Sequence, residues 1–299
     1  MKKSVTFLLA ALVVAAAAPA FADGRLEKIK ASGEIALGHR DTSIPFSYLD
    51  DKQQPIGYSM DICHKIVEAV KAKLGMDKLN VKLVPVTSST RIPLLANGTV
   101  DLNCGSSTNN QERQAQVTFA PTTFVTATRF VSKKSAGYND LNDLKGKTVV
   151  STAGTSNIRW LTGANDEQKL GLKIIPTKDH AEAFLTVNNG RAAAFFMDDI
   201  LLAGLVATSR NPAEWTISKK AYTVEPYAIM EPKDDPEFKK VVDGAIIAMM
   251  KDGSLATLYK KWFESPVPPK NVNLNWPMSE QLKRVVEHPT DSPNPDDYK

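Results

Sequence analysis

Short runs of β-forming residues alternate with helical patterns along most of this 299-residue chain. No other feature constrains the fold as strongly. The alternation runs as two series, one from residue 34 and one from about residue 144. Strand-like segments lie at 34–38, 81–86, 99–104, 148–151, 173–175 and 192–197, and helical ones at 59–74, from 91, from 156, and at 180–187, 235–250 and 255–263. Strands that alternate with helices predict βαβ units, which form mostly parallel sheets flanked by helices.

Two such series predict two α/β lobes, with the second inserted into the first. We expect hinge crossings near 127–130 and 224–228. The first lobe would then be discontinuous, with residues 23–126 and 227–299, and the second would hold residues 127–226. Open α/β sheets bind ligands in the crevice outside the carboxyl ends of their strands, so the cleft between the lobes is the expected ligand site.

Several helix and chain ends carry local signals. Asp235 and Pro236 before an apolar periodic segment, with Gly253 just after it, predict the start and end of one helix. Ser59 is expected to cap the helix over 59–74. The last ten residues are rich in Pro and Asp, and we expect them to form a frayed tail.

The N-terminus has the pattern of a secretory signal peptide. Lys2 and Lys3 precede an uncharged apolar run over residues 7–18, and Pro19 and a small-x-small site at 20–22 follow. This pattern predicts a leader of residues 1–22 that is cleaved before Asp23. The run is short for a membrane anchor, so the mature chain should be exported.

Charge and motifs exclude several classes of protein. The formal net charge is +4, and it falls to +2 without Lys2 and Lys3, which is too little for a nucleic-acid binder. The sequence contains neither GxSxG nor GxGxxG, and its four histidines show no metal-ligand spacing. We therefore expect no cofactor and no metal.

The two cysteines, Cys63 and Cys104, admit two interpretations. An exported chain with an even number of cysteines permits a disulfide. Two buried free thiols are the alternative, because the sequence does not give the distance between them.

Cationic and hydroxyl side chains gather where the predicted strands end. These candidates are Arg40, Ser88, Arg91, Ser106, Thr108, Arg113, Thr155, Ser156, His180 and Asp198. Each has an ordinary alternative, such as a helix cap for Ser88 or a surface ion pair for Arg113. Three arginines at strand ends would repel one another unless a ligand neutralised them. Because guanidinium groups match carboxylate geometry and helix starts favour anions, the set predicts a small anion with more than one carboxylate.

Six segments resemble the periplasmic glutamate/aspartate-binding proteins, which belong to the polar amino-acid family of ABC-importer substrate-binding proteins. They are HRDTSIPFSY (39–48), GYS (57–59), TSSTRIPLL (87–95), CGSSTNNQER (104–113), FMDD (196–199) and KWFESPVPPK (261–270). The resemblance covers nearly all of the mature chain. It implies a type II periplasmic binding protein fold with the ligand in the interlobe cleft, and it leaves the pairing of the cysteines open.

The resemblance also implies roles for the candidate residues. Arg113, Thr108 and the helix start at Thr155 and Ser156 match positions that hold a ligand α-carboxylate. Asp198 and Ser106 match positions that receive an α-ammonium. The pocket for the side-chain carboxylate is matched by Arg40, Ser88, Arg91 and His180.

The expected function is therefore capture of L-glutamate and L-aspartate by hinge closure. The chain would be a periplasmic monomer that delivers them to an inner-membrane ABC permease, without nucleic acid and without catalysis. A dehydratase-like periplasmic enzyme on a small carboxylate is the alternative, with His180 and Asp198 as an acid/base pair. Asp198 is better explained as an ammonium partner, and no second carboxylate is expected near it.

Overall fold

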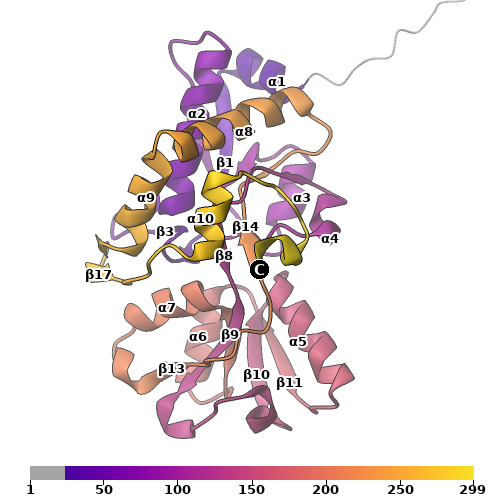
Figure 1. Cartoon of the computed structure of the whole chain (residues 1–299), viewed down its shortest axis with the longest axis vertical. Coiled ribbons are helices and arrows are strands. Elements are labelled where there is room, and N and C mark those ends of the chain that lie inside the picture. Colours follow the sequence, from indigo (N-terminus) through magenta and orange to yellow (C-terminus); the bar gives the residue numbers. More distant parts are fainter. Residues whose placement is uncertain (1–23) are drawn as a thin grey trace, which may run out of the picture.

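The computed structural model describes residues 24–299 and shows two lobes, one above the other in Figure 1. The predicted leader, residues 1–22, lies outside the described residues. Within residues 24–299, no helix is both long enough and apolar enough to cross a membrane.

The first lobe is built on a five-stranded sheet of order β5-β1-β6-β15-β7. These strands are β1 (Glu34–His39), β5 (Asn80–Pro85), β6 (Leu102–Asn103), β7 (Thr118–Phe119) and β15 (Met230–Glu231). Leu37 of β1 pairs in parallel with Leu83 of β5 and Leu102 of β6. Only β15 runs against its neighbours, so the sheet is mostly parallel.

Helices and small strands complete this lobe. The helices are α1 (Arg25–Ser32), α2 (Tyr58–Lys73), α3 (Arg91–Ala96), α4 (Gln111–Gln114), α8 (Pro236–Lys251), α9 (Ser254–Phe263) and α10 (Glu280–Glu287). The small strands are β2 (Thr42–Ser43), β3 (Ser47–Leu49), β4 (Pro55–Ile56), β16 (Pro266–Val267) and β17 (Val272–Asn273). The third predicted strand is shorter than expected: it begins at Leu102 rather than Thr99, because the Asn97 side chain accepts a hydrogen bond from the Thr99 N–H in the preceding loop.

The second lobe repeats the same plan, with a sheet of order β11-β10-β12-β9-β13. The strands are β9 (Thr128–Lys133), β10 (Thr148–Thr152), β11 (Lys173–Thr177), β12 (Phe195–Asp198) and β13 (Trp215–Ile217), and the helices are α5 (Ser156–Glu167), α6 (His180–Asn188) and α7 (Asp199–Ala207). Here β9 is the strand that runs against its neighbours. Two mostly parallel sheets flanked by helices confirm the predicted α/β class.

Two short antiparallel strands, β8 (Phe124–Thr126) and β14 (Glu225–Tyr227), lie between the lobes in Figure 1. Glu225 pairs with Thr126, and Tyr227 pairs with Phe124. The chain leaves the first sheet through β8 and returns through β14, so this pair of strands is where a hinge would bend.

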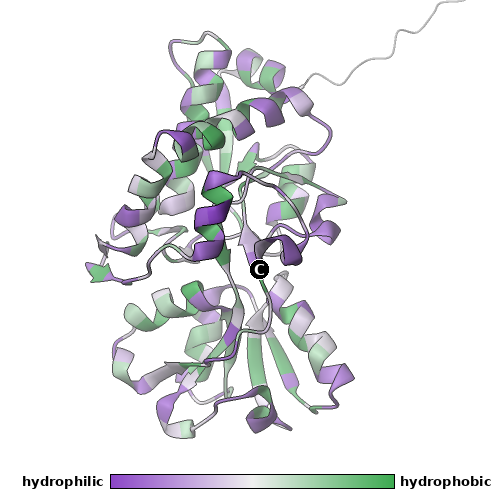
Figure 2. Ribbon diagram, in the orientation of Figure 1, coloured by the Kyte–Doolittle hydropathy of each residue, from purple (hydrophilic) through white to green (hydrophobic). Residues whose placement is uncertain are grey.

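Hydrophobic residues concentrate on the strands and on the helix faces that cover them (Figure 2). In the first lobe, Phe124 stacks on Phe263 with ring centroids 4.8 Å apart, and Phe263 stacks on Tyr259 at 4.4 Å. The second lobe has its own core around Phe130, Leu161 and other buried residues. Apolar burial of this kind is the main force that holds each lobe together.

Two helix-start predictions had different outcomes. Asp235 does cap α8, because its Oδ1 accepts a hydrogen bond of 3.0 Å from the Phe238 N–H. Ser59 does not cap α2, which begins after Gly57, and the Ser59 hydroxyl instead donates to the Gly105 carbonyl at 3.1 Å. Only glycine fits at residue 57, since a Cβ there would stand 2.3 Å from the Phe46 carbonyl oxygen.

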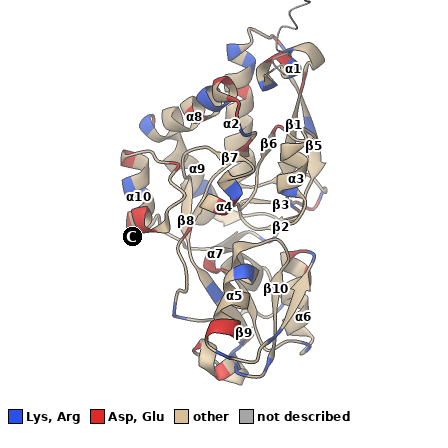
Figure 3. Cartoon of the chain, turned by 90° about the vertical axis from the view of Figure 1, so that its right-hand side faces the viewer, with Lys and Arg blue, Asp and Glu red and all other residues tan. Residues whose placement is uncertain are grey.

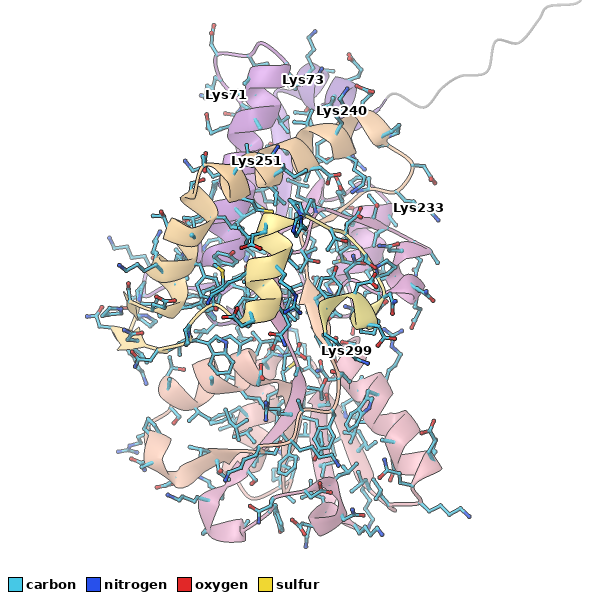
Figure 4. The ribbon with its side chains drawn as sticks, viewed as in Figure 1. Lys71, Lys73, Lys233, Lys240, Lys251 and Lys299 are labelled. Atoms are coloured by element: carbon cyan, nitrogen blue, oxygen red, sulfur yellow. A yellow bond between two sulfur atoms is a disulfide. The ribbon has the colours of Figure 1, made fainter. Side chains whose placement is uncertain are left out.

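The C-terminal residues are not frayed, contrary to the prediction. They end in a 3₁₀ turn over Pro295–Tyr298, and the Tyr298 side chain is buried against the first lobe. The Tyr298 hydroxyl lies 2.9 Å from Thr122 Oγ1, and Asn109 Nδ2 donates to the Asp291 carbonyl at 2.7 Å. In Figure 4 the labelled Lys299 lies beside the connection between the lobes. The buried aromatic ring and these hydrogen bonds hold the tail in place.

A disulfide joins Cys63 of α2 to Cys104, with an S–S distance of 2.09 Å and Cα atoms 6.1 Å apart. Both cysteines are fully buried. The bond ties α2 to the segment that leads into Ser106 and Thr108.

Candidate functional site

A small cavity of about 10 Å³ lies between the lobes. Nine of the ten predicted site residues line it. From the first lobe these are Ser88, Arg91, Ser106, Thr108 and Arg113, and from the second Thr155, Ser156, His180 and Asp198. The structure adds three residues that the sequence analysis missed: Asn157, Met197 and Leu201.

The tenth residue, Arg40, is not among the residues that line the cavity. Its Cγ is 3.0 Å from the position of a Cβ at Gly105, so glycine at 105 leaves room for the arginine side chain. The Arg40 charge also reaches into the site, because it is one of the causes that lower the pKa of His180. The structure therefore brings Arg40 next to the cavity.

The fold explains why these side chains meet. Arg40 follows β1, Ser106 follows β6, and Asp198 ends β12. His180 and Ser156 are the first residues of α6 and α5. Since the carboxyl ends of parallel strands share one edge of a sheet, each lobe presents its strand-end residues to the same cleft.

The three arginines are almost fully buried. Arg91 Nη1 donates to the Ser106 carbonyl at 2.9 Å and to Ser107 Oγ at 2.8 Å, and Arg113 Nη1 donates to the Thr108 carbonyl at 2.7 Å. Burial lowers the pKa of Arg40 to about 10. Burial, and then the charges of Arg113 and Arg40, hold the pKa of Arg91 well below its usual range. Buried cations this close are unfavourable unless an anion compensates them.

Five polar atoms of the predicted site residues are buried without a hydrogen-bond partner within residues 24–299. They are Arg40 Nη1, Ser88 Oγ, Arg91 Nε, Ser106 Oγ and His180 Nε2. Buried polar side-chain atoms normally have partners. Five such atoms around one cavity fit a polar ligand.

His180 is neutral in this environment. Burial, and then the charges of Arg40 and Arg91, hold its pKa well below the usual range. Its Nδ1 lies 2.8 Å from Thr152 Oγ1. When the threonine hydroxyl donates to Nδ1, the proton of the neutral ring is on Nε2 and can be donated to a carboxylate.

Asp198 supplies the acidic group of the cavity. Asn157 Nδ2 donates to its Oδ1 at 2.6 Å, and the Tyr227 hydroxyl donates to its Oδ2. Burial, and then the charge of Glu225, raise the pKa of Asp198 to about 8. A buried carboxylate in this position would be stabilised by a cationic group such as an ammonium.

Glu225 corrects one expectation, because a second carboxylate does lie near Asp198. It is buried on β14, where Ser156 Oγ donates to its Oε2 at 2.8 Å and Thr223 Oγ1 donates to its Oε1 at 2.7 Å. The sequence analysis missed Glu225 because this residue follows no strand end. The sequence did offer one indication of its importance, because residue 225 lies within the predicted return crossing, 224–228.

The lobes contact each other around the cavity. Thr108 Oγ1 lies 3.3 Å from Ser156 Oγ, and Arg113 Nη2 donates to the Gly154 carbonyl at 3.4 Å. Glu112 of α4 and Arg159 of α5 form an ion pair between the lobes. These contacts join the two lobes next to the cavity.

Together, the groups suit a small molecule with two carboxylates and one ammonium. Three guanidinium groups against the two carboxylates of Asp198 and Glu225 still give the site a net positive charge. This positive charge is confined to the site, because Figure 3 shows acidic and basic residues spread over both lobes. Within residues 24–299, no group of three or more His, Cys, Asp or Glu side chains could hold a metal ion.

Comparisons with known proteins agree with this geometry. Residues 35–265 match the family model of bacterial extracellular solute-binding proteins, family 3. The L-glutamate/L-aspartate-binding protein of Pseudomonas aeruginosa is 51% identical over 290 residues, which cover 95% of this chain and 96% of that protein. The glutamate/aspartate import solute-binding protein of Escherichia coli is 46% identical, with 97% and 98% covered. These relatives are named as binding proteins and not as enzymes, which argues against the catalytic alternative.

Solved structures show the same two-lobe fold. An ancestral arginine-binding protein bound to arginine has a TM-score of 0.70 and 26% identity, and the match covers 77% of this chain and 98% of that one. The solute receptor for L-cysteine of Neisseria gonorrhoeae has a TM-score of 0.68 and 27% identity, with 79% and 92% covered. These likenesses confirm the expected type II fold. The chain belongs to the bacterial extracellular solute-binding proteins, family 3.

Proposed function

We propose that this protein captures L-glutamate and L-aspartate between its lobes and delivers them to an inner-membrane ABC permease. The observation that carries the proposal is the cavity between the lobes, which Arg91, Arg113 and Asp198 line, with the buried Arg40 next to it and unpartnered polar atoms around it. The names of the relatives that are about half identical over nearly the whole chain support it.

In this proposal the ligand α-carboxylate binds Arg113, Thr108 and the start of α5 at Thr155 and Ser156. Its α-ammonium binds Asp198 and Ser106. The side-chain carboxylate binds Arg40, Ser88, Arg91 and His180. Each charged group of an acidic amino acid then has an opposite partner.

The charges also determine which amino acids are excluded. Glutamine would leave Arg40 and Arg91 without an anionic partner, and loss of one partner of a buried charged pair typically costs about 2–5 kcal/mol. Arginine would bring a cation against the guanidinium groups. Glutamate and aspartate differ by one methylene, which is worth only about 1–3 kcal/mol, so both should bind.

Closure is part of the proposal. The first lobe, residues 23–126 and 227–299, and the second, residues 127–226, would separate by bending at β8 and β14 and close on the ligand. Contacts that form only when the lobes are closed would stabilise the closed state. The protein would act as a monomer in the periplasm after cleavage of its leader.

A thermal-shift screen of the refolded protein against the twenty amino acids tests the proposal. A ligand that binds the native state alone stabilises it by RT ln(1 + [L]/Kd), so glutamate and aspartate should raise the Tm most. Mass spectrometry of the same mixtures should show both amino acids unchanged. A larger Tm increase with a basic or apolar amino acid, or formation of a product, would contradict the proposal.

A further inference from the structure

Glu225 occupies the junction between the two lobes and the hinge strands. It is 4% exposed and lies on β14, opposite Thr126 of β8. Its Oε2 accepts the hydrogen bond from Ser156, the first residue of α5 in the second lobe, and Ser156 Oγ lies 3.3 Å from Thr108 Oγ1 of the first lobe. One carboxylate on the hinge is thus linked to both walls of the cavity.

Counting protons fixes the direction of these hydrogen bonds. An ionised carboxylate only accepts, and a serine hydroxyl has one proton to donate. Both oxygens of Glu225 accept from hydroxyl groups, Oε1 from Thr223 and Oε2 from Ser156. The Ser156 proton is therefore committed to Glu225, and the Thr108 hydroxyl must donate to Ser156.

This direction leaves the Ser156 hydroxyl without a proton for a ligand carboxylate. The Thr108 hydroxyl proton is committed as well, so what remains at this end of the cavity is the Arg113 guanidinium with the backbone N–H groups of Thr108 and of the start of α5. The start of a helix is suited to hold an anion through such groups. The Ser156 side chain then links the lobes, while its backbone faces the ligand.

We propose that Glu225 is a positioning residue that locks the closed state: it holds Ser156, and through Ser156 the start of α5, against Thr108 of the first lobe. Glu225 contacts no ligand in this account. The proposal rests on the proposed function, because it explains how the same site keeps its ligand.

The electrostatics of the site agree with this role. Burial lowers the pKa of Arg113, and Glu225 is the charged group that opposes this effect most. Glu225 therefore also stabilises the cation that is expected to hold the ligand α-carboxylate. Loss of its charge would weaken both the link between the lobes and the field at Arg113.

The test compares Glu225→Gln with Glu167→Gln, a control on the exposed end of α5. A glutamine keeps the size of the side chain but has only one acceptor oxygen. Loss of a hydrogen bond to a charged group should weaken L-glutamate binding roughly tenfold to hundredfold. Stopped-flow fluorescence should place most of this change in the dissociation rate, because the closed state is what is lost. The control should bind like the wild type.

A double-mutant cycle separates this role from a merely structural one. If Ser156 acts through Glu225, the double variant Glu225→Gln/Ser156→Ala should bind no more weakly than the weaker single variant. The inference would be overturned if the effects of the two substitutions on affinity multiplied in the double variant. It would also be overturned if the Glu225→Gln variant released L-glutamate at the wild-type rate. Should Glu225→Gln not fold, as judged by circular dichroism, Ser156→Ala alone must raise the dissociation rate, and a wild-type rate would overturn the inference. A wild-type protein that does not bind L-glutamate would overturn the proposed function itself.

Discussion

Gly204 of α7 lies directly against the backbone carbonyl oxygen of Ile44, so that a Cβ at Gly204 would stand 2.7 Å from that oxygen. Ile44 lies between β2 and β3 of the first lobe, and α7 belongs to the second. The two lobes therefore approach so closely here that only a residue without a side chain fits. The proposed hinge motion would break this contact when the lobes separate.

Gly204→Ala should for this reason weaken ligand binding without unfolding either lobe. The added methyl group collides with backbone, which cannot move as a side-chain tip can, so closure must stop short. We expect the affinity for L-glutamate to fall at least tenfold, about 1.4 kcal/mol, in calorimetric titrations. Gly163→Ala, on the helix α5, is the control, because a Cβ there meets nothing within 4 Å. Equal affinities for the two variants would show that this contact does not form on closure.

Arg40→Met tests the positive charge next to the cavity. The Arg40 side chain is 2% exposed, and its Nη1 has no partner within residues 24–299. The variant should lose about 2–5 kcal/mol of L-glutamate binding, whereas the free energy of unfolding of the ligand-free protein should not fall. Calorimetry and urea unfolding measure the two quantities, with the exposed Arg210→Met as control. Parallel losses of binding and stability would make Arg40 a structural residue.

Asp198 should make binding depend on pH. Its raised pKa of about 8 means that the carboxyl group is mostly protonated at pH 7, while an ammonium ligand requires the carboxylate. Ligand binding should therefore release protons at pH 7, and affinity should rise from pH 6 to pH 8 and then level off. Titrations in buffers of different ionisation enthalpy measure the released protons. Asp198→Asn should abolish the release, and an unchanged release in that variant would assign the titration to another group.

The same raised pKa predicts how stability changes with pH. The native state keeps the Asp198 proton up to its raised pKa of about 8, whereas the unfolded state loses it near the ordinary aspartate pKa of 3.8. The native state therefore binds more protons between these values, and the contribution of Asp198 to stability falls as the pH rises through this range and is constant above it. In urea titrations, the free energy of unfolding of the ligand-free wild type should fall between pH 5 and pH 8 relative to that of the Asp198→Asn variant. A difference in the free energy of unfolding between the two proteins that does not change with pH would contradict the prediction.

The disulfide should stabilise the first lobe. Cys63 and Cys104 are separated by 41 positions in the sequence, and a loop of this size corresponds to about 2–4 kcal/mol in the free energy of unfolding. Cys63→Ala/Cys104→Ala should lose this amount in urea titrations. Because both cysteines are fully buried, reductant should leave the folded wild type intact. Equal stabilities of the oxidised wild type and the double variant would contradict the prediction.

Much of the fold could be predicted because the periodic signals are strong and local. The strand at Glu34–His39 and the helix α8 follow from apolar spacing and from Asp235 and Pro236 at a helix start. The tail could not be predicted in this way. Its order depends on Tyr298 and Thr122, which meet across 176 positions of sequence.

The residues of the candidate site also fall into those that could be predicted from the sequence and those that could not. Residues such as Arg91 and Asp198 could be predicted because strand ends converge on one edge of a sheet. Met197 and Leu201 line the cavity only through the packing of β12 and α7 against the cleft. Glu225 comes from a hinge strand, and no periodic pattern in the sequence indicates which side chain of that strand reaches Ser156.

Calorimetric titration of the mature, ligand-stripped protein with L-glutamate, L-aspartate, L-glutamine and L-arginine measures which of these amino acids the cavity between the lobes binds. The protein should be refolded first, so that no ligand carried through purification blocks the cavity. The account predicts tight binding of both acidic amino acids, with glutamine at least tenfold weaker and arginine without measurable heat of binding. Glutamine binding as tight as glutamate, or no binding of either acidic amino acid, would contradict the assignment of the three arginines to a dicarboxylate ligand.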